Sequence, residues 1–184
     1  MLPTMKRQKI LMSGKEMSRT LERLAFEILE RHGECDALGL VGVQRRGVEL
    51  AQRLRRLLEA RLNCEMPLGK LDINLYRDDW TNLNYQPQIN QTDIPFAIDG
   101  KRLILVDDVL YSGRTVRAAL EAILDFGRPR SVELLVLVDR GHRELPIQAD
   151  YVGKKLSIAR EERVDVSVAE QDGEDCVRLA DESL

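Results

Sequence analysis

Hydrophobic positions in the first third of the chain change from helical spacing to a short uninterrupted run. Ser13 and Glu16 form a capping box, and Gly33 ends the helix that this pair starts. The apolar positions between them, all on one helical face, are Met17, Leu21, Leu24, Ala25, Ile28 and Leu29. The run "ALGLVGV" at 37–43 predicts a strand covered on both faces, and the amphipathic "GVELAQRLRRLLEARL" predicts a helix after it.

The alternation of strand and helix continues through the second half. "KLDINLY" at 70–76 alternates like a half-buried strand, whereas 77–100 is polar, contains Pro87 and Pro95, and predicts a long loop or a hairpin. "RLILV" predicts a buried strand, 115–126 a helix, "SVELLVLV" another strand, and "RVDVSVA" a late antiparallel edge strand. The pattern predicts an open α/β sheet, mainly parallel and flanked by helices, which binds ligands beyond the carboxyl ends of its strands.

Composition narrows the class of protein. A chain of 184 residues that is 43% hydrophobic can form one globular domain over 1–184. Its net charge of −3 argues against binding nucleic acid through bulk positive charge. The three cysteines, Cys35, Cys64 and Cys176, form no CxxC pair, so we expect buried or inert thiols. No apolar stretch reaches the roughly 18 residues of a membrane span, so we expect a cytoplasmic protein without membrane contact.

The stretch "LILVDDVLYSGRT" carries the most specific chemistry. Asp107 and Asp108 follow a buried strand, where two carboxylates suit a ribose diol and hydrated Mg²⁺. The small residues Ser112, Gly113 and Thr115 then leave the amides of a helix start open to a phosphate. The alternative is an ordinary β-α turn with an Asp cap. Neither GxxxxGK[ST] nor GxGxxG occurs, so this is not a P-loop or dinucleotide site.

This stretch resembles the signature of type I phosphoribosyltransferases. The resemblance implies that the substrate phosphoribosyl pyrophosphate is bound, with Mg²⁺ as cofactor, by the whole turn: Asp107, Asp108, Val109, Leu110, Tyr111, Ser112, Gly113, Arg114 and Thr115. It implies no protein residue that ligates Mg²⁺ directly, because the ion is held through the substrate and water. Purine-specific members usually carry an aspartate where this chain has Tyr111, so a purine substrate is disfavoured.

Further segments resemble the PyrR family of bifunctional pyrimidine operon regulators with uracil phosphoribosyltransferase activity. They are "VGVQRRG", "DINLYRDD", "DIPFAIDGKRLILVDDVLYSGRTVRAAL", "GRPRSVELLVLVDRGHRELPIQADYVGK" and "ERVDVSVAEQDGED". The resemblance implies a type I phosphoribosyltransferase fold with a small hood, from about 139–184 with part of the N-terminus, and a flexible flap at about 77–100. It also implies a homo-oligomer, a dimer or higher.

The same resemblance assigns roles around the substrate. Arg45, Arg46 and Gly47 match a pyrophosphate loop, unless the two arginines are only a solvated pair. Arg77, at the start of the flap, would act in catalysis by neutralising pyrophosphate beside Asp107 and Asp108. The flap residues Asp78 and Asp79 have a plain alternative reading as a charged loop tip.

Base recognition is implied for four residues after the last core strand: Asp139, Arg140, Tyr151 and Val152. Val152 would offer backbone polar groups to uracil, whereas Arg140 is either base-binding or structural. The expected reaction makes UMP and pyrophosphate from uracil, and no residue of these motifs stands out as a general base. Charge neutralisation and positioning would then carry catalysis.

The competing function is a UMP-sensing attenuator that binds the leader mRNA of pyrimidine genes, with catalysis secondary. The basic candidates for that surface are Arg23, Arg31, His142, Arg143 and Lys154. Against this, Glu22, Phe26 and Gln148 stand where RNA-binding members tend to carry a threonine, a histidine and an arginine. We therefore rank the enzyme first and RNA attenuation second.

Overall fold

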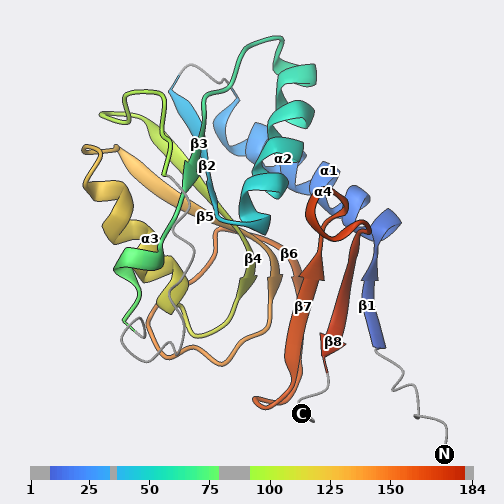
Figure 1. The fold of residues 1–184 in the computed structure, drawn as a ribbon. Coiled ribbons are helices and arrows are strands. Elements are labelled where there is room, and N and C mark those ends of the chain that lie inside the picture. The colour runs from blue at the N-terminus through green and yellow to red at the C-terminus, as the bar shows by residue number, and fades with distance from the viewer. Residues whose placement is uncertain (1–8, 34–36, 79–91, 181–184) are drawn as a thin grey trace, which may run out of the picture.

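A computed structural model describes residues 9–33, 37–78 and 92–180 of the chain (Figure 1). The chain forms thirteen elements within these ranges. In order they are β1 (Lys9–Ser13), α1 (Gly14–His32), β2 (Leu38–Val43), α2 (Arg46–Leu62), β3 (Leu68–Leu71), the 3₁₀ helix η1 (Asn74–Tyr76), β4 (Arg102–Leu110), α3 (Arg114–Leu124), β5 (Ser131–Asp139), β6 (Tyr151–Lys155), β7 (Arg163–Ser167), α4 (Ala169–Asp172) and β8 (Cys176–Ala180).

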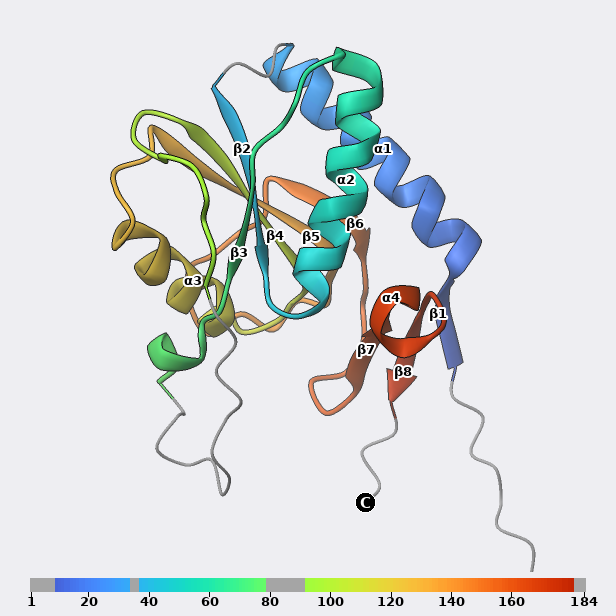
Figure 2. The same ribbon diagram turned by 45° about the horizontal axis from the view of Figure 1, so that its top comes forward.

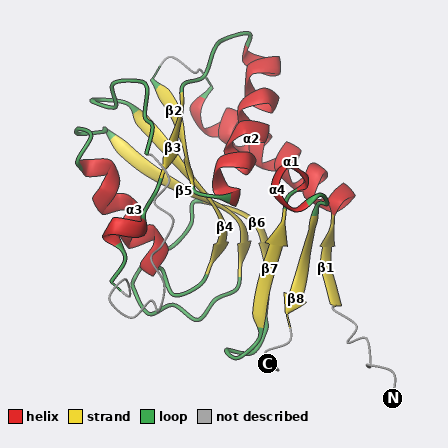
Figure 3. Ribbon diagram, in the orientation of Figure 1, coloured by secondary structure: helices red, strands yellow, loops and turns green. Residues whose placement is uncertain are grey.

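The larger of two sheets is wholly parallel and has the strand order β3-β2-β4-β5-β6 (Figure 3). The predicted open, parallel α/β sheet flanked by helices is therefore confirmed. The chain adds β3 on one side of β2 and then β4 to β6 on the other, so the strand order reverses between β2 and β4. Such a reversal opens a crevice at the carboxyl ends of the two strands, where α/β proteins bind ligands.

Helices cover both faces of this sheet, which explains the unbroken apolar runs of its central strands. α1 and α2 pack on one face, against side chains such as Leu40, Ile104 and Leu135. α3 packs on the other face, against Val41, Leu105 and Val136 among others. Figure 2 shows the two-helix layer and the α3 layer on opposite sides of the strands. The two apolar cores hold the carboxyl ends of the strands in fixed positions.

The smaller sheet is antiparallel, with the order β1-β8-β7. It lies beside β6 and below α2 in Figure 1, and the short helix α4 sits between it and the start of α2 (Figures 1 and 2). Val164 and Val166 of β7 face the core shared with α1, which leaves the alternate residue Asp165 exposed. The predicted antiparallel edge strand is confirmed as β7, at the edge of this second sheet.

The sequence predicted the start of α1 correctly but the extent of β3 wrongly. The capping box is confirmed, because the Ser13 hydroxyl accepts from the Glu16 amide at 3.4 Å and the Ser13 amide donates to the Glu16 carboxylate at 2.7 Å. The strand predicted at 70–76 is wrong beyond Leu71. There the buried Asp72 carboxylate accepts from the Asn74 amide at 2.8 Å, and this turn starts η1 in place of further strand.

Two sequence expectations concern the whole chain. In the described ranges, no helix combines the length and the apolar character that a bilayer span requires. Cys176 is a buried free thiol, as expected. Cys64, two residues after α2, is disulfide-bonded, so the expectation of a free thiol is wrong for this residue.

Candidate active site

The loop after β2 and the acidic pair of β4 meet at the reversal of strand order. Val41 pairs with Leu105 and Gly42 with Val106, so the residues that follow β2 lie beside Asp107. A Cβ added to Gly47 would come within 2.5 Å of the Val106 carbonyl oxygen and 3.3 Å of the Asp107 Cα. Only glycine allows this approach. The structure thus brings the predicted pyrophosphate loop and the acidic pair together.

Asp107 and Asp108 are part of β4, which continues to Leu110. Asp107 is only 5% exposed, and one of its carboxylate oxygens accepts from the Asp108 amide at 2.9 Å. An Asp108 oxygen accepts in turn from the Val109 amide at 2.8 Å. Burial, and then the charge of Asp108, raise the pKa of Asp107 well above its ordinary value, and burial also raises the pKa of Asp108. The pair is therefore an electrostatically strained site that a cation or a diol would relieve.

This strain predicts that Asp107→Asn stabilises the unliganded protein. The native pKa of Asp107 lies above the unfolded value, so the unfolded chain releases its proton first and stability falls as pH rises through that window. Asn carries no charge, and we expect its melting temperature at pH 8 to exceed the wild-type value by about 2 to 6 °C. The difference should shrink towards pH 4.

Thermal unfolding at pH 4, 6 and 8 measures the effect. Asp99→Asn is the matched control, because Asp99 precedes the amino end of the same strand and its carboxylate accepts from the Arg128 amide at 2.9 Å. An Asp107→Asn protein less stable than wild type at pH 8 would show that burial does not strain this carboxylate.

The turn after β4 leaves the start of α3 open. Gly113, with φ of 91°, is the N-cap of α3 and offers no side chain to its first amides, of which the Arg114 amide donates to the Ser112 hydroxyl at 3.3 Å. A Cβ at Gly113 would also meet Ile147 at 3.3 Å. Ser112 is held from the other side, since its carbonyl accepts from the Glu144 and Leu145 amides at 2.9 and 3.0 Å. Open amides, the helix dipole and two hydroxyl groups suit a phosphate monoester here.

The two arginines of the predicted pyrophosphate loop differ in their surroundings. The Arg46 guanidinium donates to both carboxylate oxygens of Asp172 in α4, each at 3.0 Å. The hydrogen bonds to Asp172 contribute most to a raised pKa of Arg46. Burial acts in the opposite direction, and the charges of Asp172, Asp108 and Asp165 add to the net rise. Arg45 is exposed, and its carbonyl accepts from Gln171 at 3.2 Å. α4 therefore joins the small sheet to the pyrophosphate loop.

The start of the predicted flap is attached to α3 and to the predicted phosphate-binding turn, Val109 to Thr115. Arg117 of α3 donates to the Tyr76 carbonyl at 2.7 Å, and Arg114 forms a short ion pair with Asp78. Arg114 also donates to Glu144 at 2.7 Å. Arg77 is exposed between these two contacts. Asp79 and the flap as far as residue 91 lie outside the described residues.

The four predicted base-binding residues do not gather at one place. The Tyr151 side chain points into the core beneath α1, where its hydroxyl donates to Glu133 at 2.7 Å, because strand alternation turns it from the crevice. The Val152 carbonyl accepts from Arg23 at 3.2 Å. The Asp139 carboxylate accepts from Arg143 at 2.7 Å. Asp139 pairs with Leu110 at the end of β4, and the Arg140 side chain stacks on the Tyr111 ring, so these two lie against the predicted phosphate-binding turn.

The basic residues proposed for an RNA surface all have partners within the chain. Arg23 binds the Gly153 carbonyl at 2.6 Å, and Arg31 binds Asp150 at 3.3 Å. His142 contacts the Ile158 carbonyl at 2.8 Å, while Arg143 binds Asp139 and three backbone carbonyls. Lys154 donates to the Leu11 carbonyl at 2.6 Å. Some of the hydrogen-bond donors of these side chains are therefore already bound to acceptors within the chain.

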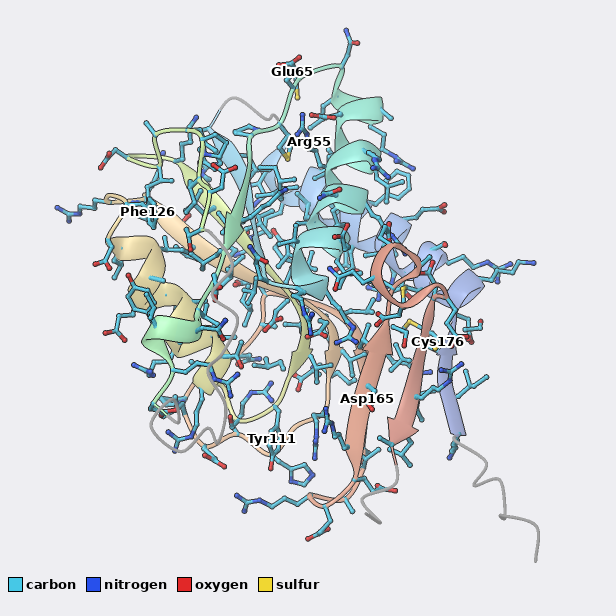
Figure 4. The ribbon with its side chains drawn as sticks, viewed as in Figure 1. Arg55, Glu65, Tyr111, Phe126, Asp165 and Cys176 are labelled. Atoms are coloured by element: carbon cyan, nitrogen blue, oxygen red, sulfur yellow. The ribbon has the colours of Figure 1, made fainter. Side chains whose placement is uncertain are left out.

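Sequence reasoning missed Asp165 and Asp172. Both carboxylates act on Arg46, Asp172 by direct contact and Asp165 by charge. Figure 4 shows Asp165 on β7 and Tyr111 directly after β4, both in the lower part of the view. The alternation of "RVDVSVA" held a signal for Asp165, because it put the valines inside and the carboxylate outside.

Comparison with known proteins shows the family to which this chain belongs. The profile of the phosphoribosyl transferase domain family matches residues 7–171. The Bifunctional protein PyrR of Thermus aquaticus is 54% identical over 169 residues, which cover 92% of this chain and 93% of the relative. The chain belongs to the PyrR family. The PyrR protein of Deinococcus radiodurans is 53% identical over 171 residues, covering 93% of each chain.

Solved structures agree on the fold. Hypoxanthine phosphoribosyltransferase from Trypanosoma cruzi superposes with a TM-score of 0.72 at 21% identity, over 96% of each chain. A second such enzyme, from Staphylococcus aureus, gives 0.69 at 18% identity over 95% of this chain and 93% of its own. This member of the PyrR family thus has the type I phosphoribosyltransferase fold that its sequence predicted, with a parallel sheet and a small antiparallel one.

Proposed function

We propose that the protein is a uracil phosphoribosyltransferase, which makes UMP and pyrophosphate from uracil and phosphoribosyl pyrophosphate. One observation carries the proposal: three features meet at the carboxyl ends of β2 and β4. They are the buried acidic pair, the start of α3 after Gly113, and the arginine loop that Gly47 brings against β4. Those three parts match the ribose, 5′-phosphate and pyrophosphate of one substrate. Membership of the PyrR family supports the choice of uracil.

Each part then has a chemical task. Asp107 and Asp108 orient the ribose diol, and the turn from Val109 to Thr115 holds the 5′-phosphate. Arg45 and Arg46 neutralise the pyrophosphate as it leaves, with Arg77 approaching from the flap. The acidic pair also fits hydrated Mg²⁺, since burial raises the pKa of both carboxylates and a nearby cation would favour their charged forms. When bound, Mg²⁺ supplies further charge neutralisation of the pyrophosphate.

The reaction replaces the bond between C1′ and pyrophosphate by one between C1′ and N1 of uracil. We assign no general base, and the N1 proton leaves to solvent or to the pyrophosphate. The small sheet with β6 would act as the hood that shields this step from water. Arg46 and Asp172 connect that sheet to the pyrophosphate loop.

RNA attenuation is the second candidate, because the PyrR relatives are named bifunctional. A UMP-sensing contact with leader mRNA would be that second function. We rank it behind catalysis on two grounds: the basic candidates already bind carbonyls or carboxylates of this chain, and Glu22 carries a negative charge on α1 beside Arg23. A carboxylate repels the phosphates that dominate RNA affinity.

Base choice tests the enzyme assignment. With Tyr111 in the turn, uracil should outcompete hypoxanthine and guanine, by on the order of a hundredfold in kcat/KM. Side-by-side assays with each base at saturating phosphoribosyl pyrophosphate and Mg²⁺ measure this. Comparable kcat/KM values for uracil and a purine would overturn the assignment to uracil, while leaving the phosphoribosyltransferase domain in place.

A further inference from the structure

The short helix α4 contacts one face of α2, beside the predicted pyrophosphate loop (Figure 2). Three polar residues in the first turns of α2 lie three and then four positions apart, so they share a face: Arg46, Glu49 and Arg53. Consecutive residues of α4 bind them in the opposite order. The pairs are Asp172 with Arg46 at 3.0 Å, Gln171 with Glu49 at 3.2 Å, and Glu170 with Arg53 at 2.9 Å. α4 therefore docks on α2 through a matched series of polar contacts.

The Asp172 carboxylate is itself held in place. It accepts from the Val168 amide at 2.9 Å, and the Asp172 amide donates to the Val168 carbonyl at 2.7 Å. At the other end of α4, Asp175 accepts from the Ala169 amide at 2.8 Å and from Arg53 at 2.7 and 2.9 Å. These bonds fix α4 to its own sheet and to α2. Asp172 therefore has a defined position beside the predicted pyrophosphate loop.

Arg46 takes its orientation from Asp172. Its Nε and Nη2 each donate to a different carboxylate oxygen at 3.0 Å, a two-bond fork that fixes the plane of the guanidinium. The charge of Asp108 also acts on Arg46, so the guanidinium lies within electrostatic reach of the acidic pair. Gln171 donates to the Arg45 carbonyl at 3.2 Å, so α4 holds the backbone of the loop as well.

The bond to Asp172 leaves Arg46 able to bind an anion. A guanidinium has five N–H donors in one plane, and the fork to Asp172 uses the edge formed by Nε and Nη2. The edge formed by the two terminal nitrogens can therefore bind an anion while Asp172 holds the first edge. Asp172 and a bound phosphate group need not compete for the side chain.

We propose that Asp172 is a positioning residue for pyrophosphate, because it holds the Arg46 side chain in the orientation in which the loop binds the diphosphate. This inference rests on the proposed phosphoribosyltransferase activity and gives the small sheet a part in it. An arginine that Asp172 did not restrain would lose more side-chain freedom each time pyrophosphate bound, and binding would weaken. Asp172 also repels an anion by its charge, so the inference requires that positioning outweighs this repulsion.

Asp172→Asn tests this proposal, since Asn keeps the size of the side chain and loses its charge and one of the two acceptors for Arg46. The hydrogen bonds with Arg46 lower the pKa of Asp172, so the wild-type carboxylate is charged at neutral pH. Calorimetric titration with Mg²⁺ and inorganic pyrophosphate should show a Kd raised about fivefold to tenfold. In UMP synthesis, KM for phosphoribosyl pyrophosphate should rise by the same factor, while KM for uracil stays unchanged.

Two matched variants separate positioning from charge and from docking. Asp165 acts on Arg46 by its charge, so Asp165→Asn should leave the Kd for pyrophosphate unchanged or lower it, the opposite of Asp172→Asn. Glu170→Gln weakens the contact between α4 and Arg53 without touching the loop, and its Kd should stay within about twofold of the wild-type value. Adding Asp172→Asn to Arg46→Lys should weaken binding no further, because lysine cannot form the fork.

A measurement on the wild-type protein makes the test independent of whether a variant folds. The Nε–H signal of Arg46 in ¹⁵N NMR spectra, assigned by its loss in Arg46→Lys, should stay protected from exchange with water when pyrophosphate binds, because Asp172 keeps its bond. Faster exchange on binding would show that pyrophosphate displaces Asp172, and would overturn the inference.

The titrations can overturn it as well. An unchanged or lower Kd for Asp172→Asn, or equal losses for Asp172→Asn and Glu170→Gln, would make Asp172 a docking contact only. Failure of the wild-type protein to bind pyrophosphate would have the same consequence. A wild-type protein that binds pyrophosphate as described but makes no UMP would instead defeat the proposed function and leave the role of Asp172 standing.

Discussion

Asp107→Asn and Asp108→Asn should each lower kcat/KM for UMP synthesis by well over tenfold, on the order of a hundredfold. Each substitution keeps the shape of the side chain and removes one charge of the pair. That charge orients the ribose diol and attracts hydrated Mg²⁺. Asp107 should show the larger loss with a gain in stability, because its carboxylate is the more buried of the two.

Steady-state assays with varied Mg²⁺ and phosphoribosyl pyrophosphate check this result. Asp99→Asn again serves as the control, since it makes the same chemical change before the amino end of β4, where no substrate is expected. If both pair variants kept near wild-type kinetics and an unchanged Mg²⁺ dependence, the assignment of this site would be lost.

The second large effect concerns RNA. At near-physiological salt we expect weak or absent binding of a leader hairpin from the protein's own pyrimidine genes. Glu22 carries a negative charge on α1, the Phe26 ring is 55% exposed and covered on one face by Arg61 at 4.4 Å, and Gln148 carries no charge. Each lost charged contact costs about 1 to 3 kcal/mol, so three together weaken binding by about a hundredfold or more.

These three positions belong to neighbouring parts of the surface. Arg31 of α1 contacts Asp150, two residues after Gln148, so α1 and this segment lie side by side. Substituting Glu22→Thr, Phe26→His and Gln148→Arg should therefore strengthen hairpin binding without altering UMP synthesis. The measurement is a titration at about 0.15 M salt, with and without UMP.

A scrambled hairpin controls for non-specific attraction. Tight, UMP-stimulated binding of the native hairpin by the wild-type protein, absent with the scrambled one, would contradict this prediction. RNA attenuation would then become the first function. The same outcome would show that the internal contacts of Arg23, Arg31 and Lys154 exchange readily for phosphates.

Features set by neighbouring residues could be predicted from the sequence. The Ser13 and Glu16 capping box located the start of α1, and the run at Leu38–Val43 identified a strand covered by helices on both sides. The acidic pair and the turn after it could also be predicted, because the carboxylates, the glycine and the start of the helix follow one another within a single β-α unit. Such signals depend on spacing along the chain alone.

Features set by contacts between distant residues could not be predicted from the sequence. β1 pairs with β8, from which most of the chain separates it in sequence, and the hydrophobic periodicity of the two strands does not predict this pairing. Tyr151 points under α1 because β6 joins the edge of the parallel sheet in one particular register. The stack of Arg140 on Tyr111 joins the ends of two adjacent strands, so neither residue reveals it alone. Tertiary packing decides these contacts, as it does for the carboxylates around Arg46.

The measurement that tests the central claim most directly is the formation of UMP by the purified wild-type chain. Labelled uracil, phosphoribosyl pyrophosphate and Mg²⁺ are supplied, and labelled UMP and released pyrophosphate are followed together over time. We predict equal amounts of the two products, with turnover on the order of 1 to 1,000 per second and none when either substrate or Mg²⁺ is withheld. Absence of UMP with all three present, from a protein that is folded by its thermal transition, would contradict the proposed function.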